Sequence, residues 1–220
     1  MKRLLLHIKE WFFPSKCILC RSLLREEESD LCRRCRTETD ENPQGKLKLQ
    51  FIDRTAAVWY YKGNVRKSLH RYKFNRCQFL AEPFGRLMAM KLLTAEMADA
   101  DLITWVPVSP IRRFIRGYDQ DELLAQVISR ELDIPCEGLL KKVRHNRPQS
   151  RISGYARRRA NVLGVYRAPD PEMILGKRIV LVDDILTTGA TATECARVLL
   201  TAGAEQVNCV VVASAHHNNP

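Results

Sequence analysis

The chain has 220 residues, of which 45% are hydrophobic and 28% charged, so it can hold one α/β-sized core and a small appendage. A core of this size excludes dependence on disulfides for stability. The 36 Lys and Arg residues against 25 Asp and Glu residues give a net charge of +11, which favours a polyanionic ligand or partner without choosing between a small phosphorylated molecule and a nucleic acid.

The first thirteen residues begin like a signal peptide, with Lys2 and Arg3 ahead of three leucines. His7, Lys9 and Glu10 interrupt the apolar stretch, which is too short for a signal sequence and far too short for a membrane span. We expect a short amphipathic helix that docks on the domain, no stable insertion into a membrane, and a cytoplasmic protein. Reducing conditions there make disulfides improbable.

Four cysteines form two Cys-x-x-Cys pairs separated by eleven residues: Cys17, Cys20, Cys32 and Cys35. This spacing can close a tetrahedral thiolate site around a structural zinc ion, and the alternative is four free thiols. A thioredoxin-like redox pair does not fit, because that motif opens a helix within a βαβ unit. The polar run 39–48 indicates a linker. We therefore expect a zinc-binding unit over residues 1–45 and a larger domain over residues 46–220.

The larger domain alternates between strand and helix patterns. The expected strands cover residues 55–61, 102–108, 179–182 and 207–213. The expected helices start near Pro83, at Asp119-x-x-Glu122 and at Ala190, and residues 65–74 form a helix or a loop. Such alternation predicts a parallel α/β sheet flanked by helices.

Residues 178–191 contain the pattern that is most informative about function. The run from Ile179 to Val182 has no polar alternation, as expected of a strand buried on both faces, and Asp183 and Asp184 follow it. Gly189 can adopt a positive φ, and a helix begins directly after it. The backbone N–H groups and the helix dipole make a monophosphate site from five residues: Thr187, Thr188, Gly189, Ala190 and Thr191.

Two carboxylates beside a phosphate site would repel the phosphate, so we expect them to face neutral hydroxyl groups of the same ligand. A ligand with a phosphate at one end and a diol nearby is a ribose 5-phosphate. A P-loop and a dinucleotide-binding glycine motif are both absent, and a receiver domain would lack the Thr-Thr-Gly sequence. The stretch from Val182 to Thr191 resembles the phosphoribosyl pyrophosphate (PRPP) motif of type I phosphoribosyltransferases. The resemblance implies that Asp183 and Asp184 hold the ribose hydroxyls and that the threonine loop holds the 5-phosphate. In a transfer reaction on such a ligand, one of the two acids is a candidate general base.

A second set of candidate residues follows the expected strand that ends at Val108. Residues 109–118 form a predicted loop with three arginines and no acid. The loop lies on the ligand side of the sheet, where a diphosphate would contact Ser109, Arg112, Arg113 and Arg116. A solvated basic loop is the alternative.

Residues 144–161 contain six arginines and no carboxylate. Such a segment repels itself until an anion neutralises it, as expected of a lid that closes over a ligand. The candidate lid residues are Arg147, Gln149, Arg151 and Arg158. The same segment is also the best candidate for binding single-stranded nucleic acid, with Tyr155 available for stacking.

The two cysteine pairs, the Leu-His-Arg-Tyr-Lys-Phe segment, the Arg-Gly-Tyr-Asp-Gln segment and the Asp-Asp-x-x-Thr-Thr-Gly motif together resemble the ComF family. The resemblance implies a zinc ribbon on a type I phosphoribosyltransferase fold, with Mg²⁺ and PRPP as ligands and a role in uptake or use of external DNA. It leaves the acceptor substrate open. The alternative function is a non-catalytic accessory protein that binds single-stranded DNA and keeps the PRPP pocket as a sensor or relic.

Overall fold

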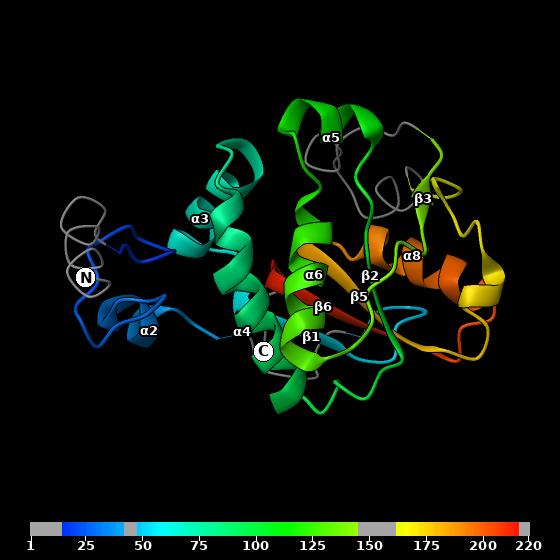
Figure 1. Cartoon of the computed structure of the whole chain (residues 1–220), viewed down its shortest axis with the longest axis horizontal. Helices are drawn as coiled ribbons and strands as arrows, with labels where there is room; N and C mark the ends of the chain where they lie inside the picture. The colour runs from blue at the N-terminus through cyan, green and yellow to red at the C-terminus, as the bar shows by residue number, and fades with distance from the viewer. Residues whose placement is uncertain (1–14, 42–47, 145–161, 216–220) are drawn as a thin grey trace, which may run out of the picture.

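The computed structural model describes residues 15–41, 48–144 and 162–215. A parallel sheet of four strands forms its centre, in the order β1-β6-β5-β2 (Figure 1). The strands are β1 (Thr55–Tyr60), β2 (Leu102–Trp105), β5 (Arg178–Leu186) and β6 (Gln206–Ser214). This confirms the predicted α/β class.

The two faces of the sheet pack into separate hydrophobic cores. Val180 and Val182 of β5 face the core that includes helices α4 and α6, whereas Ile179 and Leu181 face the core that includes α8. All four side chains are at most 1% exposed, which explains why the strand shows no polar alternation in sequence.

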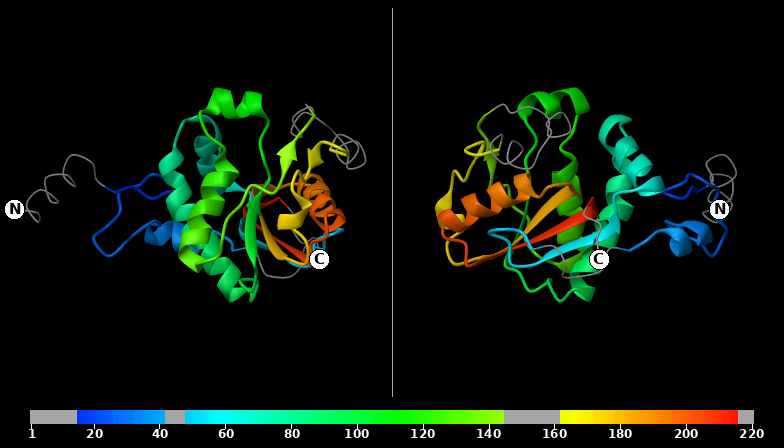
Figure 2. Two further views of the ribbon diagram at one scale, coloured as in Figure 1. Left: turned by 45° about the vertical axis from the view of Figure 1, so that its right-hand side comes forward. Right: turned by 180° about the vertical axis from the view of Figure 1, so that it is seen from behind.

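Helices cover both faces of the sheet (Figure 2). Helices α4 (Ala81–Thr94) and α6 (Gln120–Leu132) pack side by side on one face, and α8 (Ala190–Thr201) covers the other. A Cβ built on Gly85 of α4 would lie only 2.4 Å from Val127 Cβ of α6. The absence of a side chain at Gly85 therefore sets how closely the two helices approach.

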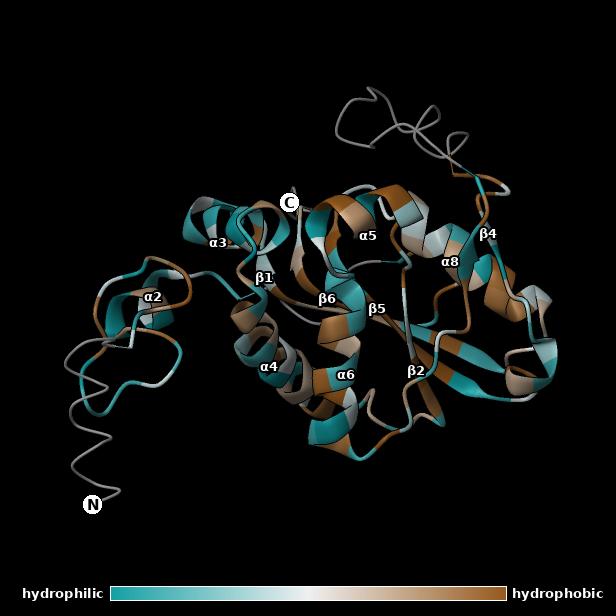
Figure 3. Ribbon diagram, turned by 45° about the horizontal axis from the view of Figure 1, so that its top comes forward, coloured by the Kyte–Doolittle hydropathy of each residue, from teal (hydrophilic) through white to brown (hydrophobic). Residues whose placement is uncertain are grey.

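A small lobe formed by residues 15–41 lies at one end of the molecule (Figures 1 and 3). It contains α2 (Arg33–Glu38) and contacts helix α3 (Gly63–Phe74). Arg71 of α3 donates to the carbonyl oxygens of Ile18 and Leu19 at 2.8 and 2.9 Å. Arg86 of α4 pairs with Asp30 of the lobe at 3.0 Å. The division at residue 45 falls outside the described residues and stays a prediction.

The remaining elements are short. They are the 3₁₀ turns η1 (Gln78–Leu80) and η3 (Pro171–Met173), helix α5 (Pro110–Arg116), and the antiparallel pair β3 (Lys141–Lys142) and β4 (Tyr166–Arg167). In the part of the chain that the structure describes, no helix has the length and apolarity to cross a membrane.

The structure corrects three sequence predictions. The predicted loop 109–118 contains helix α5, because Ser109 caps its N-terminus and Gly117, with φ of 82°, ends it. Strand β2 ends at Trp105 rather than at Val108. Strand β5 continues to Leu186. Asp183 and Asp184 therefore lie inside the hydrogen-bonded strand, near its carboxyl end, rather than beyond it. The expected helix over residues 1–13 lies outside the described residues.

Candidate active site and zinc site

The predicted phosphate loop lies between the end of β5 and the start of α8. Gly189 is the N-cap of α8 and has φ of 74°, as the sequence predicts for this position. A Cβ on Gly189 would lie 2.4 Å from Leu49 Cδ2, so the backbone and the leucine approach closely. Thr187 is exposed, Thr188 and Thr191 are half-buried, and Ala190 is buried at the first turn of the helix. The positive end of the α8 dipole thus points into this loop.

The two predicted catalytic carboxylates lie directly before this loop, in β5. Asp183 is 9% exposed and Asp184 is 3% exposed. Asp183 Oδ1 accepts a hydrogen bond of 2.8 Å from the backbone N–H of Asp184. The structure therefore brings the predicted phosphate loop and the predicted acids to the same edge of the sheet.

A third carboxylate, which the sequence analysis did not identify, completes this group. Asp121 lies in the first turn of α6 and is 2% exposed. Carboxylate oxygens of Asp121, Asp183 and Asp184 all lie within 4.8 Å of one another. Three acids from two elements thus form one buried cluster.

Lys73, near the end of α3, pairs with this cluster. Its Nζ lies 2.9 Å from Asp184 Oδ2, and its side chain is 21% exposed. Burial alone would lower the pKa of Lys73, but the charge of Asp184 and the hydrogen bond to it outweigh burial and raise that pKa. Lys73 is therefore charged at neutral pH.

Burial and mutual repulsion act on the carboxylates. Burial, followed by the charge of Asp184, raises the pKa of Asp183 to about 8. Burial, again followed by the charge of Asp184, raises the pKa of Asp121 well above its usual value. The cluster therefore favours protons or other cations, as expected when like charges are placed together in a buried site.

The residues predicted to contact a diphosphate lie on α5 or cap it. Ser109 Oγ accepts from the backbone N–H of Arg112 at 3.4 Å. Arg113 is exposed and pairs with Glu122 at 3.2 Å, and Arg116 donates to Gln120 Oε1 at 2.6 Å. These partners lie on the first turn of α6, next to Asp121.

Arg112 belongs to a second group of cations. Burial, followed by the nearby charge of Arg116, lowers the pKa of Arg112. Burial, followed by the charge of Arg112, lowers the pKa of Lys142 to about 8. Lys142 lies over the ring of Tyr166 at 5.4 Å. An anion placed among these groups would relieve their mutual repulsion.

The candidate lid residues Arg147, Gln149, Arg151 and Arg158 lie outside the described residues.

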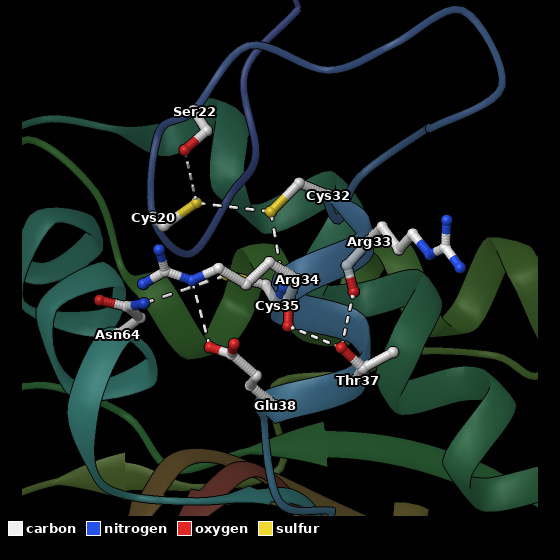
Figure 4. A network of polar contacts seen from close by, with 9 residues as sticks. All are labelled: Cys20, Ser22, Cys32, Arg33, Arg34, Cys35, Thr37, Glu38 and Asn64. Carbon is white, nitrogen blue, oxygen red and sulfur yellow. Dashed lines mark hydrogen bonds and ion pairs between the residues drawn. The ribbon is translucent and has the colours of Figure 1, made fainter.

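The four predicted metal ligands lie together in the small lobe, and Figure 4 shows three of them, Cys20, Cys32 and Cys35. The Sγ atoms of Cys17, Cys20, Cys32 and Cys35 are all within 4.8 Å of one another, and Cys20 Sγ lies 3.6 Å from Cys32 Sγ. A tetrahedral site with Zn–S bonds of about 2.3 Å separates its sulfur atoms by about 3.8 Å. The donor set and its spacing therefore fit a structural zinc ion.

Comparison with known proteins agrees with the phosphoribosyltransferase part of this arrangement. The family model for the phosphoribosyl transferase domain matches residues 122–219. The chain is 27% identical to Competence protein F of Haemophilus influenzae over 218 residues, which cover 89% of this chain and 95% of the relative. It is 30% identical to the DNA utilization protein YhgH of Escherichia coli K12 over 217 residues, which cover 88% of this chain and 94% of the relative. The chain belongs to the ComF family.

A solved structure is also similar to this ComF-family chain. It is the glutamine PRPP amidotransferase of B. subtilis complexed with ADP and GMP, with 26% identity and a TM-score of 0.41 over 60% of this chain. The chain spans only 25% of the length of that enzyme. The match to the family model and the cluster of four cysteines show that the ComF-family chain combines a cysteine lobe with a phosphoribosyltransferase domain.

Sequence reasoning missed three charged residues of this ComF-family site: Lys73, Asp121 and Lys142. Lys73 and Lys142 are far from the PRPP motif in sequence, and only the fold brings them near it. Asp121 was hidden within the capping pattern of Asp119 and Glu122, where the Asp119 side chain accepts from the N–H groups of Asp121 and Glu122. The sequence signal that could have identified Asp121 was its position on the face of α6 that packs against the sheet, where an acidic residue is unusual.

Proposed function

We propose that the chain binds PRPP with Mg²⁺ at the carboxyl edge of its sheet and transfers the phosphoribosyl group with release of pyrophosphate. The observation that carries this proposal is the meeting of the Gly189 loop at the α8 N-terminus with the carboxylates of Asp183 and Asp184. A phosphate and a sugar diol are the ligand groups that suit these two neighbours.

Each ligand group has a set of candidate residues. The 5-phosphate binds the loop formed by Thr187, Thr188, Gly189, Ala190 and Thr191. Asp183 and Asp184 accept hydrogen bonds from the ribose hydroxyls. The diphosphate binds Ser109, Arg112 and Arg116, with Lys142 as a further cation. Arg113 contributes less direct contact, since it is exposed and paired with Glu122.

The chemistry follows from these contacts. Departure of pyrophosphate from the ribose C1 leaves an oxocarbenium-like centre, so neutralising the leaving group lowers the barrier more than activating a nucleophile does. Arg112, Arg116 and Lys142 supply positive charge for the departing diphosphate. A bound Mg²⁺ ion supplies further charge neutralisation on the diphosphate. The zinc ion in the cysteine lobe has a structural role.

Calorimetric titration of PRPP with Mg²⁺ tests the proposal. Asp184→Asn removes the carboxylate that faces the diol, and we expect it to abolish binding while the fold stays intact. Asp101→Asn is the matched control, because Asp101 pairs with Arg178 at the opposite, amino-terminal end of the same strands. Unchanged PRPP binding by Asp184→Asn would refute the assignment. Pyrophosphate release with candidate acceptors then tests turnover.

A role in the use of DNA rests on the names of two relatives, Competence protein F and the DNA utilization protein YhgH. A second candidate function, an accessory protein that binds single-stranded DNA, is favoured by helix α5. Phe114 on α5 is 90% exposed, and Arg116 lies over the Phe74 ring at 5.2 Å. Exposed aromatic rings beside arginines suit stacked bases. DNA affinity that falls steeply with salt and ignores PRPP would favour this function over the enzyme.

A further inference from the structure

The carboxylate cluster has one atom that nothing described in the structure satisfies. Asp121 Oδ1 is buried and has no hydrogen-bond partner among the described residues. Its other oxygen, Oδ2, receives only a 3.5 Å contact from Gln120 Nε2. A buried carboxylate oxygen without a donor is costly, so its presence points to a ligand that supplies positive charge.

The charge balance of the cluster leads to the same requirement. Asp121, Asp183 and Asp184 contribute three carboxylates, and Lys73 forms the one salt bridge to them among the described residues. One ammonium group therefore faces three acids. When they ionise, the acids leave an excess of negative charge at a buried edge of the sheet where water cannot screen it well, so protons or another cation must balance it.

The geometry and chemistry of the cluster suit a hard divalent cation. Opposite ligands of an octahedral Mg²⁺ ion are about 4.2 Å apart, and adjacent ones about 3.0 Å. One carboxylate oxygen from each of the three aspartates already lies within 4.8 Å of the other two, which is close to this spacing. Carboxylates are the ligands that Mg²⁺ and Mn²⁺ prefer, and thiolates such as those of the cysteine lobe are not.

We propose that Asp121, Asp183 and Asp184 bind one Mg²⁺ or Mn²⁺ ion directly, and that the ammonium group of Lys73 competes with this ion for Asp184. Three carboxylates leave further coordination positions for water or for the hydroxyls of a ligand. The ion binds without PRPP, so this inference does not rest on the proposed function. If PRPP also binds, its diol contacts the ion as well as the acids.

The test is a titration of the zinc-loaded full chain with Mn²⁺, without PRPP, in which electron paramagnetic resonance reports free Mn²⁺. We expect the unaltered chain to bind one Mn²⁺ ion at this site. Asp121→Asn should weaken Mn²⁺ binding by at least about tenfold, because it removes a ligand charge at constant shape. Lys73→Met should tighten binding by about tenfold, because it removes the competing ammonium. Asp101→Asn, at the other end of the sheet, should bind like the unaltered chain.

The two opposite effects distinguish a cation site from a merely structural acid cluster. Asp121→Asn is expected to fold, since asparagine keeps the shape of the side chain and removes a buried acidic group whose ionised form its neighbours repel, and circular dichroism with zinc content checks this. Protection of the unaltered chain by Mg²⁺ against thermal unfolding, absent in Asp121→Asn, is a second measurement. The proposal is overturned by the absence of saturable Mn²⁺ binding, by unchanged binding in Asp121→Asn, or by weaker binding in Lys73→Met. PRPP is titrated separately, so its failure to bind leaves these outcomes unaffected.

Discussion

Replacing Gly189 by alanine tests the geometry of the phosphate loop through two separable costs. The first cost is conformational, because Gly189 has φ of 74° at the N-cap of α8. An alanine in this left-handed region is disfavoured by about 1–2 kcal/mol. The second cost is steric, because the new Cβ would lie 2.4 Å from Leu49 Cδ2 and 3.0 Å from Leu49 Cδ1.

The steric cost can be bounded. Carbon atoms pack best at about 3.5–4.0 Å, so Leu49 or the loop must shift by about 1 Å. Overpacking of this kind costs about 1–3 kcal/mol, toward the lower end here because the Leu49 methyl groups are the flexible end of a side chain. Gly189→Ala should therefore lower the free energy of unfolding by about 2–4 kcal/mol.

Urea denaturation of Gly189→Ala, Leu49→Ala and the double variant separates the two costs. In the double variant the steric part disappears and the conformational part remains, so a coupling energy of about 1–3 kcal/mol is expected. Gly189→Asn is a further control, since asparagine tolerates a positive φ better but still carries a Cβ. A coupling energy within about 0.5 kcal/mol of zero would show that Leu49 does not pack on Gly189, and the description of the loop would then be wrong.

Two further predictions concern the packing and the edge of the sheet. Gly85→Ala should destabilise the chain by about 2 kcal/mol despite the better helix propensity of alanine, because Val127 Cβ cannot move without its backbone; adding Val127→Ala should recover most of this loss in the same urea assay. The hydrogen bonds from Arg178 lower the pKa of Asp101 to about 2, below its usual 3.8, so this carboxylate stabilises the fold above about pH 4 and its contribution is lost as the pH falls toward 2. The difference in stability between the unaltered chain and Asp101→Asn should therefore shrink over that window, and a constant difference would contradict the assignment.

The central strands and the last helix could be predicted because their burial is uniform. Val180 and Val182 are buried on one face of β5, and Ile179 and Leu181 are buried on the other. Because both faces are packed, the strand appears in the sequence as a continuous apolar run. Helix α8 has its Gly189 start signal in the sequence, and it begins at Ala190 as predicted.

Helix α5 could not be predicted from apolar periodicity, because its apolar residues do not face the core. Ile111, Phe114 and Ile115 are 55%, 90% and 71% exposed, and none of the residues of α5 is buried. Its signals were local ones: Ser109 before Pro110 at the start and Gly117 at the end. The prediction of a basic loop gave weight to the arginines and overlooked these caps.

The candidate site was predictable only where it is local in sequence. Asp183, Asp184 and the threonine loop follow one another along the chain, so one motif identifies them all. Lys73 and Asp121 reach the same place from α3 and α6, and no pattern within either helix indicates a partner in β5. Tertiary packing therefore determines the charge of the site, although the motif determines its location.

Helix α3 shows how the cysteine lobe and the acid cluster depend on one fold. Arg71 donates to the carbonyl oxygens of Ile18 and Leu19, within the first cysteine pair. The next residue, Tyr72, donates its hydroxyl to the carbonyl oxygen of Gln120 at 2.6 Å, beside Asp121. Lys73 then reaches Asp184. Three successive side chains of one rigid helix thus contact the lobe, the start of α6 and the end of β5. Because the position of the Lys73 ammonium is set by all three contacts, the lobe helps to fix the cation that faces the buried carboxylates, although it supplies no ligand to the site itself.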